Sequence, residues 1–517
     1  MPAAKPRNDV VSDDTRATID WLREYGLDVV DSDDRGPVHL AFHRLSQQTL
    51  LSDPVCLGIQ GALCRLDGQV DRAIRLLQRA ITRDPILPKW EVSLRTYLSA
   101  IHFTRREFAK SQSALEPALA LAPDDLEARA VQAALRAHFR DQRVWDDIAW
   151  LTDRCDADAI TDISRLRCYI RITVAARLGG KLSLAEQYGL LAFDLASQAK
   201  PALHRFVAMA AMPLASIYHS DMCDPALALH YADVGLAAAV EANDSTVIAL
   251  CASTRYSIAA EIGDLSLLEQ LHKTMSDLRG PEKGGERAGI LGAEAMFFGL
   301  TTSWTAMLQY LRTSTTEQVY DSQRPVLQAL RAVAAYGSGD EEEALRLAYA
   351  AISAGRPRIR EGSWDTRLRL ISRLLGAAVL WTADRRTEAA RALSAYRDQM
   401  LPSIRAFADA IPTEDFSTLK DSAADIYGYV RLVARLVSDN AARKQQAASP
   451  LTEREREILL ACATGATASA IAQDLKIDKA TVDWHRSNIC RKLGVKRVVT
   501  AVLRAQALGL IPANTGA

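Results

Sequence analysis

The sequence has no apolar run long enough to cross a membrane and almost no alternating β-branched segments of the kind that predict strands. No stretch of about 18 apolar residues occurs, so we expect no transmembrane helix. Residues 1–14 lack the apolar core of a signal peptide, and we expect a disordered tail there. With 49% hydrophobic and 24% charged residues, the rest of the 517-residue chain predicts a large soluble core.

Paired cysteines and catalytic motifs are also missing. The eight cysteines form no CxxC pair and no zinc-finger spacing, which indicates reduced thiols in a cytoplasmic protein. His39 and His43 lie four residues apart, but no third metal ligand accompanies them. The nearest approach to a phosphate loop, GGKLS at 179–183, has Ala175 where the first glycine is required. Neither a GxSxG nor an HExxH motif occurs, so we expect no enzyme, no metal site and no cofactor.

The chain is instead rich in paired helical segments over residues 53–437. The clearest pair is CLGIQGALCRLDGQVDRAIRLLQRAITRDP at 56–85. Its residues at the small, small, large, small and proline positions of a tetratricopeptide repeat are Gly61, Ala73, Leu77, Ala80 and Pro85. Later pairs repeat a turn, an alanine-rich helix and a break, with Ala228 and Ala344 as close-contact residues. This pattern predicts an all-α fold with a tetratricopeptide-like solenoid of on the order of ten hairpins.

The composition also predicts the domain boundaries. An introductory helix is expected to end at Gly26, because glycine favours a helix stop. A helical-repeat domain then covers 15–437, and the Gly- and charge-rich segment 278–289 either divides it into two lobes or forms a long loop. The polar, Ala- and Gln-rich segment 438–450 predicts a linker before a second domain at 451–512.

Local chemistry predicts four short helices in the second domain. Thr452 followed by Glu455 forms a capping box at the start of the first helix. Gly465 and Gly494 supply left-handed stops after the first and third helices. Asp478 is expected to cap the third helix by accepting from its free N–H groups. The second helix is expected at about 467–475, the third from Lys479, and the fourth at about 497–508, closing on Gly509.

Two short helices joined by a tight turn predict a helix-turn-helix whose second helix enters the major groove of DNA. Residues 450–517 contain ten Lys and Arg against six Asp and Glu, a net charge of +4, so the rest of this neutral chain carries −4. The acid-free stretch 486–497 covers the far end of the predicted recognition helix and holds five cations. These cations either hold DNA phosphates or form a solvated helix end that complements the helix dipole.

The segments LTEREREIL, IAQDL, ATVDWH and NICRKLGVKRVVTAV resemble the LuxR/GerE-type helix-turn-helix over about 60 residues. The resemblance implies a four-helix domain of a transcription regulator that binds double-stranded DNA as a homodimer, with RNA polymerase as a further candidate partner. The repeat region resembles that of large LuxR-type activators of the maltose-regulon-activator type, but the chain lacks their ATPase module.

Charge and resemblance together predict a set of DNA-contact residues: Lys479, Thr481, Asp483, Trp484, Arg486, Ser487, Arg491, Lys492, Lys496 and Arg497. In the family, the position of Asp483 usually holds Lys or Arg. The acid here either accepts from cytosine N4 or pairs within the helix with Lys479 or Arg486. Trp484 packs either on a thymine methyl or sugar, or in a protein interface.

These observations predict a DNA-binding transcriptional regulator that is controlled by a small-molecule or protein effector at the helical-repeat domain. The alternative is a tetratricopeptide-like interaction scaffold whose helix-turn-helix no longer binds DNA.

Overall fold

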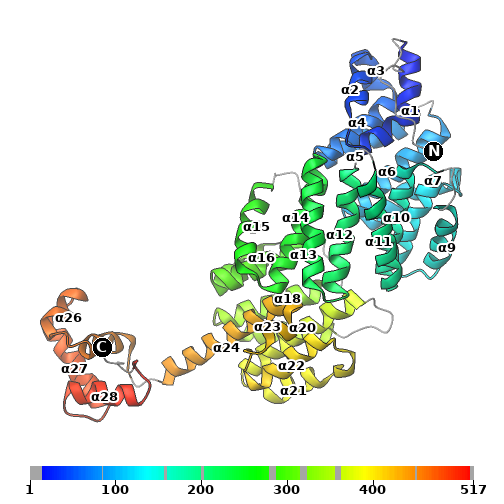
Figure 1. The fold of residues 1–517 in the computed structure, drawn as a ribbon. Helices are drawn as coiled ribbons and strands as arrows, with labels where there is room; N and C mark the ends of the chain where they lie inside the picture. The colour runs from blue at the N-terminus through cyan, green and yellow to red at the C-terminus, as the bar shows by residue number, and fades with distance from the viewer. Residues whose placement is uncertain are drawn as a thin grey trace. The chain divides into compact units, whose positions relative to one another are not determined.

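A computed structural model describes residues 14–83, 86–155, 160–199, 203–278, 287–314, 323–355, 363–448 and 451–512. All regular elements in these ranges are helices, which confirms the predicted fold class (Figure 1). The chain divides into two compact units, Met1–Leu436 (unit 1) and Val437–Ala517 (unit 2). The expected tail, apart from Asp14, and most of the expected lobe boundary fall outside the described ranges. Within those ranges, no helix is both long and apolar enough to cross a membrane.

Unit 1 is built mainly from helical hairpins. It opens with α1 (Thr15–Asp31), α2 (Gly36–His43) and α3 (Gln47–Ser52). The hairpins that follow are α4 (Pro54–Leu66) with α5 (Val70–Ile81), α6 (Pro88–Thr104) with α7 (Phe108–Leu121), α8 (Leu126–His138) with α9 (Val144–Cys155), α10 (Asp162–Leu178) with α11 (Leu182–Gln198), α12 (His204–Ser220) with α13 (Pro225–Glu241), α14 (Ser245–Ile262) with α15 (Leu265–Leu278), α16 (Arg287–Thr301) with α17 (Trp304–Thr313), α18 (Gln323–Gly337) with α19 (Glu341–Ala354), and α20 (Ser363–Thr382) with α21 (Arg386–Ser394). From α6 onward, the first helix of each hairpin also packs on the first helix of the next.

Small residues let the helices of the first hairpin approach closely, as predicted. A Cβ added to Gly61 would lie 2.9 Å from Leu77 Cγ and 3.2 Å from the Ala73 carbonyl oxygen. Ala73, Leu77 and Ala80 are fully buried, and so are the two small residues predicted in later hairpins, Ala228 and Ala344. Pro85 lies outside the described ranges. The close contacts are therefore confirmed, whereas membership of the tetratricopeptide family stays a prediction.

The first helix does not end at Gly26, contrary to expectation. α1 continues to Asp31, and Gly26 is buried inside it. A Cβ at this position would lie 2.7 Å from Ile59 Cδ1 of α4. The glycine therefore permits close helix packing here, which a sequence reading cannot distinguish from a helix stop.

The row of hairpins curls, so that helices far apart in sequence meet. α4 contacts α14, and α12 contacts α20. The Thr246 hydroxyl of α14 donates to the Arg65 carbonyl of α4 at 2.6 Å. Arg205 of α12 pairs with Asp31 of α1 at 2.9 Å. This curling gives unit 1 an interior lined by the first helices of several hairpins.

Short elements and the 22-residue α24 complete unit 1 and lead into unit 2, which is a small helical domain. The remaining helices are η1 (Arg397–Gln399), α22 (Pro402–Thr413), α23 (Leu419–Ser422), η2 (Ala424–Ile426), α24 (Tyr427–Ala448), α25 (Glu453–Ala463), α26 (Ala468–Asp474), α27 (Lys479–Lys492) and α28 (Val498–Ala507). The expected linker is helical as far as Ala448, because Ala, Gln, Lys and Arg are good helix formers. The core of unit 2 includes Ile458, Ile471, Val482 and Ile489, from three of its helices.

Candidate nucleic-acid interface

α25 begins at the predicted capping box. The Thr452 N–H donates to Glu455 Oε2 at 2.8 Å, and the Glu455 N–H donates to the Thr452 hydroxyl at 3.3 Å. Each side chain thus satisfies a backbone group that has no partner inside the helix. The box is confirmed, and it fixes the Glu455 side chain, which is only 3% exposed.

Glycines end the first and third helices of unit 2 as predicted. Gly465 has a φ of 83° and Gly494 a φ of 64°, both in the left-handed region. The N–H group of the residue after each glycine donates back into the helix, with Val495 donating to the Cys490 carbonyl at 2.9 Å. This is the bonding of a Schellman motif, which ends α27 within the predicted cation cluster, between Lys492 and Lys496.

A tight turn joins α26 to α27. Lys476 adopts a left-handed φ of 52°, and the Ile477 N–H donates to the Ala472 carbonyl at 3.0 Å. Arg454 Nη2 of α25 donates to the Leu475 carbonyl at 2.9 Å. A left-handed non-glycine residue costs about 1 kcal/mol, and these two bonds hold it in place. The tight turn predicted between the second and third helices is confirmed.

The predicted side-chain cap of α27 is wrong. Asp478 occupies the N-cap position with extended backbone, but its carboxylate forms no capping hydrogen bond. Its backbone carbonyl instead accepts from the Thr481 and Val482 N–H groups at 3.0 and 3.2 Å. Because this helix start is exposed, water can satisfy its remaining N–H groups, so the side-chain bond is not required.

The exposed side chains of α27 follow one stripe. Asp483, Trp484, Ser487 and Arg491 recur at the three- and four-residue spacings that keep side chains on one helix face. All four are exposed, and the Trp484 side chain is 62% exposed. The opposite face carries the buried residues of α27, Val482 and Ile489. Asp483, Trp484 and Ser487, three of the predicted DNA-contact residues, therefore share the solvent side of the helix.

Asp483 pairs within the helix. Its Oδ1 lies 3.7 Å from Arg486 Nη1, and both side chains are partly exposed. The predicted intrahelical pair is confirmed, with Arg486 as the partner and not Lys479. This pair neutralises part of the acidic charge on the exposed stripe, and it draws the Arg486 guanidinium toward the helix surface.

Lys492 has a partner in another helix. Its Nζ lies 2.6 Å from Oε2 of Glu455, the carboxylate of the capping box. Burial alone would raise the pKa of Glu455, but hydrogen bonds from Lys492 and Thr452 lower it below its ordinary value. Lys492 thus ties the end of α27 to the start of α25, and this structural role competes with its predicted contact to DNA phosphate.

The other predicted cations lie at the surface. Lys479, Arg491, Lys496 and Arg497 are exposed, and Arg491 Nη2 donates to Asn488 Oδ1 at 3.1 Å. Thr481 is half-buried in the first turn of α27. The end of α27 and the start of α28 thus present positive charge next to the stripe.

Sequence reasoning missed an apolar face on α28. Val499 and Leu503 are 73% and 62% exposed. They are spaced four residues apart and so share a helix face. The apolar spacing within α28 could have indicated an apolar face. The exposure of Val499 and Leu503 follows only from the structure, in which Ala501 and Ala505 are the residues of α28 that are buried in the core. Large exposed apolar side chains on one face are typical of an interaction surface.

Comparisons with known proteins agree with this architecture. Residues 449–505 match the family of bacterial regulatory proteins described as the luxR family. Over 66 residues the chain is 42% identical to the transcriptional activator protein SolR of Ralstonia nicotianae, covering 13% of this chain and 28% of that protein. It is 42% identical over 62 residues to the transcriptional regulatory protein DesR of Bacillus subtilis, covering 12% of this chain and 31% of DesR. The chain thus spans under a third of the length of these curated relatives, and unit 2 contains a helix-turn-helix domain of the luxR family.

Proposed function

We propose that this protein is a transcriptional regulator that reads duplex DNA in a sequence-specific way with α27. The observation that carries the proposal is the stripe of Asp483, Trp484, Ser487 and Arg491, which faces solvent opposite the buried side of a luxR-family helix-turn-helix. An exposed polar helix of this kind fits the major groove, where base edges present distinct donors and acceptors.

Affinity for DNA is assigned to the cations that lie beside the stripe. Arg491, Lys496 and Arg497 are exposed, and no acid occurs between residues 486 and 497. Such side chains release condensed counterions when they pair with phosphates, which makes binding depend steeply on salt. Lys479 and Thr481 are assigned DNA-backbone contacts at the start of α27, and Arg486 is assigned one near its middle. Lys492 is assigned a mainly structural role because of its pair with Glu455.

The same proposal includes a homodimer on DNA. Helix-turn-helix dimers bind two half-sites, so the protein symmetry is mirrored in the site. The exposed apolar pair Val499 and Leu503 on α28 supports a self-complementary contact of this kind. RNA polymerase is a further candidate partner on the basis of the luxR-family match alone.

Control is assigned to unit 1. Its curled hairpins enclose an interior, which favours the binding of an effector or partner there. An effector changes DNA affinity only if it binds more tightly to one of two conformations of the protein. The proposal therefore requires that ligand and DNA affinities be linked.

The DNA assignment is tested with a triple variant, Arg491→Ala, Lys496→Ala and Arg497→Ala, in the full chain. We expect weaker binding to a random duplex, and a plot of log affinity against log salt that is flatter by about 0.9 for each lost phosphate contact. The matched control carries Arg143→Ala, Arg346→Ala and Arg386→Ala, which removes equal charge from exposed arginines of unit 1. Equal affinities and slopes for the two triple variants would remove the phosphate assignment.

The competing function is an interaction scaffold whose helix-turn-helix no longer binds DNA. The acid at Asp483, on the exposed stripe, is the observation that favours it, because a carboxylate there repels phosphate. Binding to random duplex at low salt separates the two functions. A helix-turn-helix that still binds DNA should bind random duplex under these conditions without a specific site. A helix-turn-helix that has lost DNA binding should leave the duplex unbound.

A further inference from the structure

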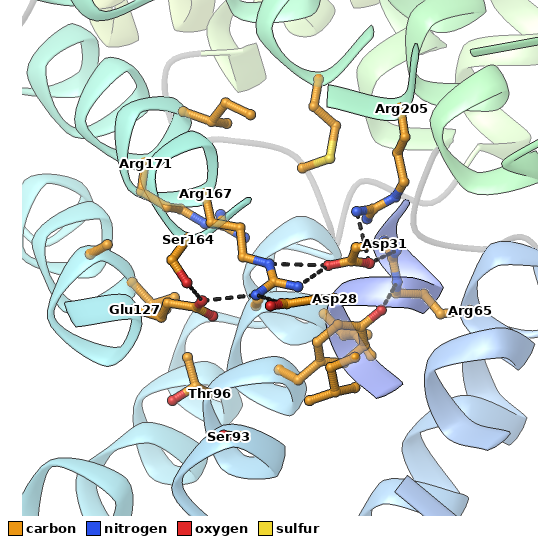
Figure 2. Close-up of a pocket in the computed structure, with 18 of the residues that line it drawn as sticks. Asp28, Asp31, Arg65, Ser93, Thr96, Glu127, Ser164, Arg167, Arg171 and Arg205 are labelled. Atoms are coloured by element: carbon orange, nitrogen blue, oxygen red, sulfur yellow. Dashed lines mark hydrogen bonds and ion pairs between the residues drawn. The ribbon is translucent and has the colours of Figure 1, made fainter. Parts of the chain in front are cut away.

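Unit 1 contains a cavity with a volume of about 750 Å³. It is lined by side chains from α1, α4, α6, α8, α10 and α12, which the curled hairpins bring together (Figure 2). Cavities of about 300–1,000 Å³ are the usual size for sites that hold small molecules. The cavity therefore has room for a ligand of metabolite size.

One wall of the cavity is a network of paired charges. Arg167 lies at its centre and contacts Asp28 at 2.9 Å, Asp31 at 2.7 Å and Glu127 at 2.8 Å (Figure 2). Arg205 contacts Asp31 at 2.9 Å. Paired and hydrogen-bonded charges of this kind are stable inside a protein without any ligand. This wall accordingly holds the helices together.

Arg171, one helical turn beyond Arg167 on α10, stands apart from this network. Among the described residues it has no hydrogen bond and no ion pair, and no dashed line reaches it in Figure 2. Its guanidinium lies over the Phe103 ring, 5.4 Å from the centroid. Burial, and then the charges of Arg65 and Arg205, lower the pKa of Arg171 to about 10. Arg171 thus lines the cavity as a cation beside other cations, and within the described ranges no carboxylate forms an ion pair with it.

A second polar group in the cavity wall also lacks a partner. The Thr96 hydroxyl belongs to a residue that is 5% exposed and lines the cavity, and in the described part of the chain it makes no hydrogen bond. Arg65 Nη2 likewise makes no hydrogen bond there, although it forms ion pairs with Asp31 at 3.7 Å and Asp244 at 3.8 Å. Both atoms are buried, so neither is assigned a contact to a ligand.

Arg171 also borders a second cavity, of about 390 Å³. Met212, Val174 and Leu327 contribute apolar side chains to its lining. A molecule that places its charged end at Arg171 can therefore bury an apolar portion nearby. Apolar burial supplies affinity, and the charged contact supplies orientation.

We propose that this interior binds a small organic oxyanion, a carboxylate or a phosphate monoester with an apolar body, with Arg171 as its counter-ion. That the bound oxyanion is the effector of a regulator rests on the proposed function, and the site then gives that effector a chemical class. Binding itself needs no DNA, so the two proposals fail separately.

The test measures binding of three probes to the full chain without DNA, by saturation-transfer NMR and titration. The probes are benzoate, phenyl phosphate and neutral benzyl alcohol. We expect at least one anion to bind at about 10 mM or below, and Arg171→Gln to weaken that anion by about ten-fold or more. Arg171→Lys keeps a charge and should retain part of the affinity. Arg346→Gln, at a surface arginine that is 63% exposed, should change nothing.

The comparison of benzoate with phenyl phosphate identifies the preferred oxyanion. Arg171→Gln should also leave the melting temperature unchanged or raise it, because it removes an uncompensated charge. The proposal is overturned if neither anion binds wild-type protein, if Arg171→Gln binds the anions as wild type does, or if benzyl alcohol binds as tightly as the anions.

Discussion

The ammonium of Lys492 lies 2.6 Å from the Glu455 carboxylate and so joins the end of α27 to the capping box of α25. The two residues are 37 positions apart in sequence. One cation of the predicted DNA surface therefore also stabilises the domain that presents that surface. Substitution of Lys492 must be expected to act on folding as well as on DNA.

Lys492→Ala should destabilise unit 2 by about 1–2 kcal/mol, because it removes a charge-assisted hydrogen bond to a buried carboxylate. Hydrogen exchange of peptides from 451–512, measured in the full chain, reports this as faster exchange in α25 and α27. Arg491→Ala is the matched control, since Arg491 is exposed and bonds only locally to Asn488. Equal protection in both variants would contradict a structural role for Lys492.

The same pair predicts a dependence on pH. The pKa of Glu455 is lower in the folded protein than its ordinary value, which is about 4.3 in unfolded chains. The pair therefore stabilises unit 2 fully above that value, and the stabilisation is lost as the pH falls through the lower, folded pKa. Exchange in α25 should accelerate over this acid range in wild type and change less in Lys492→Ala. An identical acid profile for the two proteins would contradict the expectation.

Asp483→Asn should raise affinity for random duplex DNA several-fold. The change removes an acid from the exposed stripe and releases Arg486 from the pair that holds it at 3.7 Å. The plot of log affinity against log salt should steepen by up to about 0.9 if the released arginine reaches a phosphate. Fluorescence anisotropy with a labelled random duplex measures both quantities. Unchanged or weaker non-specific binding would show that Asp483 does not oppose DNA.

Val499→Glu combined with Leu503→Glu should prevent dimer formation on DNA with little effect on the fold, because both side chains are mostly exposed. Charges placed on an apolar contact face are expensive to desolvate. Analytical ultracentrifugation of protein with duplex should show one protein per site where wild type shows two. Persistence of the two-protein complex would place the dimer contact elsewhere.

Arg167→Ala should destabilise unit 1 by about 3 kcal/mol, because it leaves Asp28, Asp31 and Glu127 without their shared partner. Arg205, Arg167 and Arg65 together lower the pKa of Asp31 to about 2 against the effect of its burial. Acid unfolding should therefore begin at a higher pH in the variant. Urea unfolding followed by circular dichroism tests the loss, with Arg346→Ala as a surface control expected within about 0.5 kcal/mol of wild type.

Features set by a few neighbouring residues were predictable from the sequence. The Thr452–Glu455 box, the stops at Gly465 and Gly494, and the close helix contact at Gly61 depend on chemistry within one turn or one hairpin. The side-chain cap at Asp478 failed because an exposed helix start has other ways to satisfy its N–H groups.

Features that join distant segments were not predictable in this way. Lys492 meets Glu455, and Arg205 meets Asp31, only because tertiary packing brings their helices together. The cavity around Arg171 has the same origin, since its walls come from helices spread along the chain, from α1 to α14. Periodicity predicts which face of each helix is buried, but not which helices meet.

The central claim is that the exposed stripe of α27 lies in the major groove of duplex DNA. Genomic pull-down with the full chain supplies a bound duplex, and dimethyl sulfate protection then probes guanine N7, an atom exposed in the major groove. The account predicts protected guanines in two half-sites about 10 base pairs apart, centre to centre, or a multiple of that distance. Protection should be lost with Trp484→Ala combined with Ser487→Ala. A tightly bound duplex whose guanines all stay reactive would contradict it.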